Sequence, residues 1–213
     1  MRHPKWTSAA STALVLISAV ALAGCGDDSD SGSMPGMNHG DKPATSATGT
    51  ASASAGEHND ADVDFATHMI PHHQQAIQMA NMAGYLATTA EVKKLATSIK
   101  AAQDPEIKQL TAWLVGWGEP VPTPDHGGHG GEPMPGMMTE DEMSDLGNAD
   151  GSAFDRMWTQ LMIKHHEGAV AMAKTEQSTG KNATAIELAK KIETSQTKEI
   201  ATLKRLLGQI PAG

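Results

Sequence analysis

The alternation of apolar and polar positions predicts two helical hairpins. Between residues 59 and 86, apolar side chains recur about every 3.6 residues, and Phe65, Met69 and Ala76 share one face of the predicted helix. The same pattern returns after residue 150. In each case a glycine, Gly84 or Gly180, lies near the expected turn, and a second amphipathic stretch follows it. The sequence therefore predicts four long helices in two pairs.

The two hairpins are copies of each other at a constant offset of 93 residues. The five residues from Met69 read Met-Ile-Pro-His-His, and the five from Met162 read Met-Ile-Lys-His-His. The same offset relates apolar, glutamine and glutamate positions over about fifty residues. Because neither hairpin is large enough to form a core alone, we expect an all-α, antiparallel four-helix bundle with a pseudo-twofold axis.

The N-terminus predicts a lipoprotein signal peptide over residues 1–24. A basic start precedes an apolar run, residues 9–23, that is short for a membrane span. The run ends in Leu-Ala-Gly-Cys, which resembles the bacterial lipobox, in which the cysteine is lipidated. The alternative is an ordinary secretory signal. We expect Cys25, the single cysteine of the chain, to anchor the mature protein at the extracytoplasmic face of the membrane.

Composition divides the rest of the chain. Residues 25–58 are rich in Ser, Gly, Ala, Thr and Asp, which predicts a flexible tether. Residues 59–213 hold the duplicated domain, with the first repeat at 59–117, a His/Met/Gly/Pro linker at 118–138 and the second repeat at 139–213. The formal net charge of -9 makes nucleic acid a poor partner.

Both repeats place metal-ligand residue types on the inner helix face. The adjacent pairs His72–His73 and His165–His166 flank the centre of this face. Methionines lie within two turns of them: Met69, Met79, Met162 and Met172. Imidazole and thioether together favour copper, above all Cu(I), and the low carboxylate count argues against calcium or magnesium. We therefore expect a copper ion, held by residues of more than one helix. Core filling remains the alternative role of the methionines.

The partner helices add polar residues on the same inner face, namely Glu106, Gln103, Glu199 and Gln196. A buried carboxylate is costly unless it is paired or bound to metal. We expect the two glutamates to orient imidazoles rather than to bind metal directly. A purely structural His–Glu network remains open.

Acidic residues near the helix starts predict caps rather than metal ligands. Asn59 with Asp62 has the spacing of a capping box, and Ser152 with Asp155 repeats it. The acidic run that begins at Glu140 predicts a short helix before the second hairpin.

Two Met/His clusters lie outside the predicted helices, and both contain Met-Pro-Gly-Met. Flexible clusters of this kind can gather soft ions where thiols would oxidise, although a plain linker is the alternative. The candidate residues for this auxiliary capture are Met34, Met37, His39, His126, His129, Met134, Met137 and Met138.

The motif around each histidine pair resembles the signature of the bacterial domain-of-unknown-function family 305. The residues that carry the resemblance are 69–80, 162–169 and 136–139, with Lys164 in place of the usual proline. The resemblance covers about residues 58–210. It implies a ferritin-like four-helix bundle, usually exported, with some relatives implicated in periplasmic copper binding, and it points to His72, His73, His165 and His166.

These patterns lead to the hypothesis of a membrane-anchored, extracytoplasmic copper buffer or chaperone without turnover. One alternative is a ferritin-like metal-dependent oxidase. Such enzymes use Glu-x-x-His motifs and more carboxylates than this chain offers. A second alternative is a structural envelope interaction module with a His–Glu core. Hydrolase chemistry has no support, because no Ser–His–Asp set, phosphate loop or cysteine nucleophile is visible.

Overall fold

The computed structural model describes residues 56–123 and 134–211. This part of the chain contains helices and no strands, so the all-α prediction is confirmed for it. The helices are α1 (Asp60–Leu86), α2 (Ala90–Trp117), α3 (Glu140–Asn148), α4 (Gly151–Thr179) and α5 (Ala183–Leu207). The predicted signal peptide and tether lie outside the described residues, and so do Cys25, Met34, Met37, His39, His126 and His129.

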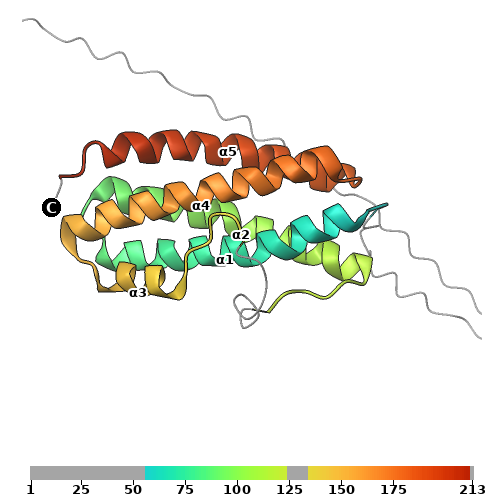
Figure 1. Ribbon diagram of the computed structural model, residues 1–213, viewed down its shortest axis with the longest axis horizontal. Helices are drawn as coiled ribbons and strands as arrows, with labels where there is room; N and C mark the ends of the chain where they lie inside the picture. Colours follow the sequence, from blue (N-terminus) through green and yellow to red (C-terminus); the bar gives the residue numbers. More distant parts are fainter. Residues whose placement is uncertain (1–55, 124–133, 212–213) are drawn as a thin grey trace, which may run out of the picture. The chain divides into compact units, whose positions relative to one another are not determined.

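The four long helices form two hairpins. α1 packs along α2, α4 packs along α5, and the two hairpins meet where α1 packs against α4 (Figure 1). The short helix α3 contacts α4 and begins at Thr139, which forms a capping box with Glu142. None of the helices in the described residues is both long enough and apolar enough to span a membrane.

The apolar core consists of two clusters. The Met69 cluster contains Phe65, Met69 and Ala169, and the Met79 cluster contains Met79 and Met162. The first half of α1 therefore packs with the second half of α4, and the second half of α1 packs with the first half of α4. The two helices thus run antiparallel. Along each helix, the histidines lie between the residues of one cluster and the residues of the other.

The capping prediction is half right. Asn59 and Asp62 form the predicted capping box, with Asn59 N donating to Asp62 Oδ2 at 2.7 Å. The second half was wrong, because Ser152 lies inside α4, which begins after Asp150. Asp155 instead accepts hydrogen bonds from Thr88 and Thr89 in the turn between α1 and α2, including the backbone N–H of Thr89 at 2.8 Å.

Asp62 makes the corresponding connection to the other hairpin. It accepts from the backbone N–H groups of Lys181 at 3.1 Å and Asn182 at 2.8 Å, in the turn between α4 and α5. The first helix of each hairpin, α1 or α4, therefore carries one buried aspartate that holds the turn of the opposite hairpin. The sequence could not show this, because the donors lie in the other repeat.

Candidate metal centre

The four predicted histidines are fully buried in a polar layer between the two apolar clusters. His72 and His73 lie on α1, and His165 and His166 lie on α4. Their helical spacing from Met69 and Met162 turns them inward, since residues three and four apart share a helix face. Because the two helices run antiparallel, the histidines of one repeat meet those of the other.

His72 and His165 form a close pair. Their ring centroids are 3.8 Å apart and their planes are tilted by 43°. The Nε2 atom of His72 lies 3.1 Å from the carbonyl oxygen of Pro135. A carbonyl oxygen can only accept, so Nε2 carries the proton and the lone pair of neutral His72 lies on Nδ1. Within the described residues, Nδ1 of His72 and both ring nitrogens of His165 have no hydrogen-bond partner.

Both rings of this pair are neutral at physiological pH. Burial is the main cause that lowers the pKa of His72 to about 3; the nearby His73 and His166 act in the same direction, and the Pro135 carbonyl opposes them. Burial likewise holds the pKa of His165 well below its ordinary value, with smaller contributions from the other three histidines. Neutral imidazole is the form that binds metal ions, so the pair is already in its ligand state.

The other two histidines are each held by a glutamate of the neighbouring helix. His73 Nε2 lies 2.7 Å from Glu106 Oε2, and His166 Nε2 lies 2.7 Å from Glu199 Oε2. The carboxylates are partly exposed, at 18% and 21%, whereas both imidazoles are fully buried. In the neutral form of each ring, Nε2 donates to the carboxylate and the lone pair lies on Nδ1, which has no partner among the described residues.

The glutamines complete the layer. Gln103 on α2 and Gln196 on α5 are 2% and 3% exposed. Neither Gln103 amide atom has a hydrogen-bond partner within the described residues, and the same holds for the Gln196 side-chain oxygen. Buried polar atoms without partners are costly, about 1–3 kcal/mol each. The layer therefore contains buried polar atoms that cost stability and whose presence folding does not explain.

The four candidate methionines do not gather at one point. Met69 belongs to one apolar cluster, against which Met172 packs, and Met79 and Met162 belong to the other. Met69 and Met162 lie one turn from the histidines. Met79 lies seven residues from His72, which is about 10 Å along the helix. Within the described residues, no group of three His, Cys, Asp or Glu side chains is arranged to hold one ion.

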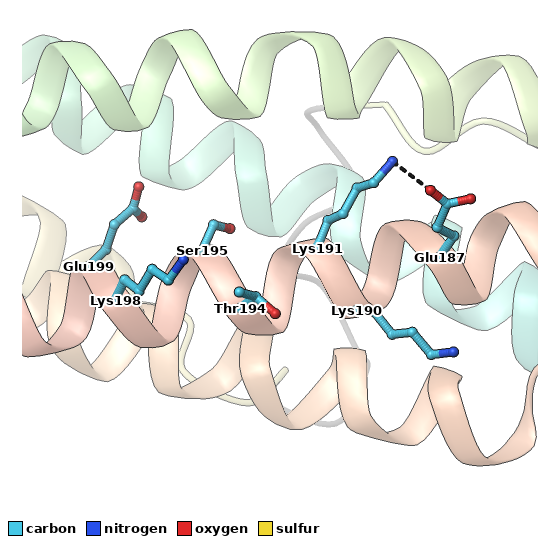
Figure 2. Close-up of a pocket in the computed structure, with 7 residues that line it drawn as sticks. All are labelled: Glu187, Lys190, Lys191, Thr194, Ser195, Lys198 and Glu199. Atoms are coloured by element: carbon cyan, nitrogen blue, oxygen red, sulfur yellow. Dashed lines mark ion pairs between the residues drawn. The ribbon is translucent and has the colours of Figure 1, made fainter.

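A shallow pocket on α5 reaches the edge of this layer. It has a volume of about 560 Å³ and is lined by Glu187, Lys190, Lys191, Thr194, Ser195, Lys198 and Glu199 (Figure 2). Glu199 and Glu187 lie at opposite ends of the row, and Glu187 is paired with Lys191 at 2.9 Å. The pocket thus brings solvent to the carboxylate that holds His166.

The segment of residues 134–138 was treated in the sequence as part of a flexible linker, but it lies against α1 and α4. The Gln75 side chain donates to Met138 O at 2.9 Å and accepts from Met138 N at 2.8 Å. The Met138 side chain is 6% exposed and belongs to the Met79 cluster. Met134 and Met137 are half-buried. A glycine in the interior of α4, Gly168, was the sequence signal for this close approach.

Sequence reasoning also missed a buried carboxyl outside the layer. Glu176 on α4 is 1% exposed. Burial is the main cause that raises the pKa of Glu176 to about 8; the neighbouring Asp62 adds to it through its charge and as an acceptor for the protonated acid. The corresponding position of the first repeat is Ala83, so the repeat pattern gave no indication of a carboxyl here.

Comparison with known proteins supports the likeness in sequence and fold. The family model for the domain of unknown function DUF305 matches residues 62–207. A DUF305 protein from Streptomyces coelicolor, named as secreted, is 33% identical, with a TM-score of 0.63 over 70% of this chain and 93% of that chain. A DUF305 fragment from Deinococcus radiodurans is 30% identical, with a TM-score of 0.64 over 72% of this chain and 99% of that one.

A third solved relative is CopM in its Cu(II)-bound form. It is 36% identical, with a TM-score of 0.61 over 70% of this chain and 96% of that chain. No curated protein matches the sequence. The family match spans most of the helical part of the chain, and the structural relatives agree with it. The chain therefore belongs to the DUF305 family.

Proposed function

We propose that this protein is an extracytoplasmic, membrane-anchored copper-binding protein that buffers copper or passes it on without turnover. The observation that carries the proposal is the His72–His165 pair. Two neutral imidazoles face each other at the centre of the fold, and both have ring nitrogens without partners in the described residues. Copper is the cargo of this site.

The donor set favours copper over other metals. Imidazole and thioether are soft or intermediate ligands, and Met69 and Met162 lie one turn from the histidine pair. A structural zinc site needs four ligands, and no group of three His, Cys, Asp or Glu side chains is available in the described residues. Cu(I) is satisfied by fewer ligands. The solved structures of CopM, at 32–36% identity, include Cu(I)-bound, Cu(II)-bound and silver-bound forms.

The remaining residues of the layer would support the pair. Glu106 and Glu199 fix the orientation of His73 and His166, and the apolar clusters on either side exclude water. The four-helix arrangement would be a ferritin-like bundle that arose by duplication of one hairpin. The constant offset and the matching His–Glu pairs support this origin.

The location of the protein follows from its N-terminus. Residues 1–24 would be removed, Cys25 would carry the lipid, and residues 25–58 would tether the domain of residues 59–213 to the membrane. The naming of the Streptomyces coelicolor relative as secreted is consistent with an extracytoplasmic site of action.

The test is a competition for Cu(I) between residues 26–213 and a chelator. Replacing both partners, His72→Leu with His165→Leu, should lower the affinity about 100-fold or more, because it removes both imidazole donors. His68→Leu is the matched control, since His68 is an exposed histidine of α1 whose Nδ1 lies 2.8 Å from the carbonyl oxygen of Asp64, away from the His72–His165 pair.

An unchanged affinity in the double variant would refute the proposal. If the double variant altered only the unfolding free energy, the histidines would be a structural network. Oxygen consumption with Fe(II) or Cu(I) that depends on Glu106 and Glu199 would instead establish the oxidase alternative.

A further inference from the structure

Residues 134–138, called the strap below, cross α1 and α4 directly beside the histidine pair. The strap is anchored at its end by Gln75, whose side-chain amide forms two hydrogen bonds with the backbone of Met138. The Met138 side chain enters the Met79 cluster. These contacts place a stretch of backbone, rather than a side chain, over the buried imidazoles.

Two glycines make this approach possible. Gly136 has a φ of +79°, which disfavours other residues, and a Cβ there would lie 2.7 Å from Lys164 O and 2.8 Å from Gly168 Cα. A Cβ on Gly168 would overlap the carbonyl group of Pro135. Glycine inside a helix is less favourable than alanine, so α4 is destabilised locally at the point where the strap docks.

The strap determines which nitrogen of His72 can bind a metal ion. The Pro135 carbonyl oxygen accepts a hydrogen bond from the N–H of His72 Nε2 at an N···O distance of 3.1 Å, which leaves the lone pair on Nδ1. The glutamates have the same effect on His73 and His166. In their neutral forms, His72, His73 and His166 thus share one tautomer, and of these three His72 is the one oriented by a backbone carbonyl.

We propose that the strap is a built part of the copper site and that Gln75 and Gly168 are its positioning residues. They seat the Pro135 carbonyl on His72 Nε2 and thereby present His72 Nδ1 to the metal. This inference rests on the copper-binding function proposed above. It also assigns a role to the repeat itself, because Gln75 and Gly168 occupy equivalent positions at the 93-residue offset. In the first repeat this position binds the strap through the Gln75 side chain, and in the second repeat Gly168 leaves space for the Pro135 carbonyl.

The first test reads the His72 tautomer in the metal-free full chain by ¹⁵N NMR of the imidazole ring. Wild type should show a proton on Nε2. Gly168→Ala should displace the strap and produce a mixture of tautomers. The matched control is Gly84→Ala, because a Cβ at this α1 glycine meets nothing within 4 Å. A His72 that stays fully Nε2-protonated in Gly168→Ala would overturn the proposal.

A second variant guards against a general effect on folding. Gln75→Leu removes both hydrogen bonds to Met138 and leaves α4 untouched, and Gln78→Leu is its control at an exposed position on the same helix. Amide hydrogen exchange at Met138 should accelerate about tenfold in Gln75→Leu, as expected for the loss of two hydrogen bonds. Equal exchange in the two leucine variants would contradict the seating of the strap.

The copper readout separates this proposal from the proposed function. Gly168→Ala and Gln75→Leu should each weaken Cu(I) binding about tenfold, the lower end of the effect of removing an orienting partner. If wild type binds no copper, the proposed function fails, and the proposal for the strap as part of a copper site fails with it. If wild type binds copper and both variants match their controls, only the strap proposal is overturned.

Discussion

Replacing Glu176 by glutamine should remove a pH dependence of stability that the fold creates. Glu176 is buried beside Asp62, and its pKa in the folded protein is raised to about 8. The group has an ordinary pKa near 4.5 in the unfolded chain. Between these two values the folded protein binds a proton that the unfolded chain releases. The stabilisation is therefore complete below about pH 4.5 and is lost as the pH rises to about 8.

The size of the effect follows from the shift. At about 1.4 kcal/mol per pKa unit, the change from 4.5 to about 8 corresponds to at most about 4–5 kcal/mol. The measured loss should be smaller, about 2–3 kcal/mol, because water can enter this end of the fold once the carboxyl ionises. Burial alone would raise the pKa of Asp62, but the hydrogen bonds that it accepts, chiefly from the backbone of Asn59 and Asn182, outweigh burial and lower it. The contribution of Asp62 to stability is therefore lost only as the pH falls.

The assay is urea unfolding of wild type and Glu176→Gln at pH 5, 7 and 9. The amide of glutamine keeps a donor for Asp62 but does not titrate, so the variant should be the more stable protein at pH 9 and should show a flatter profile. Glu167→Gln is the control, because Glu167 is an exposed glutamate of α4 whose surface pair with Lys204 contributes less than about 1 kcal/mol. If the unfolding free energy of Glu176→Gln fell with rising pH as steeply as that of wild type, this reasoning would be refuted.

Two further predictions concern the turns and the methionines. Asp155→Ala should lower the unfolding free energy by about 3 kcal/mol in urea titrations, because it removes the buried acceptor for the turn between α1 and α2; a loss below about 1 kcal/mol would contradict that role. In chelator competition, Met79→Leu should leave the Cu(I) affinity unchanged, whereas the double variant Met69→Leu with Met162→Leu should lower it. If Met79→Leu lowered the Cu(I) affinity as much as the double variant, distance from the histidines would not be what selects the methionine ligands.

The helices and the polar layer could be predicted from the sequence because both follow from local periodicity. The 3.6-residue spacing turns His73 inward, and the same spacing on the next helix turns Glu106 toward the same face. The offset of 93 residues then predicts His166 and Glu199 as the second pair. The structure brings both pairs to 2.7 Å, the contact expected for a glutamate that orients an imidazole.

The remainder depends on contacts between segments far apart in the chain. Asp155 has the spacing of a local cap, but its donors are in the opposite hairpin. The interior glycine Gly168 indicated a close approach to α4, but no local pattern identified the strap as the segment that docks there or its fit through Gly136. Glu176 has an alanine as its counterpart in the first repeat, so the repeat gave no reason to expect a carboxyl there. The histidine pair itself required the antiparallel crossing of α1 and α4.

The most direct measurement for the central claim is anomalous diffraction at the copper edge from crystals of the Cu(I)-loaded protein. We expect a copper peak between the His72 and His165 rings, with His72 bound through Nδ1. A fully loaded crystal whose copper lies only elsewhere, with the His72–His165 pair unchanged, would contradict the assignment of this pair as the copper site.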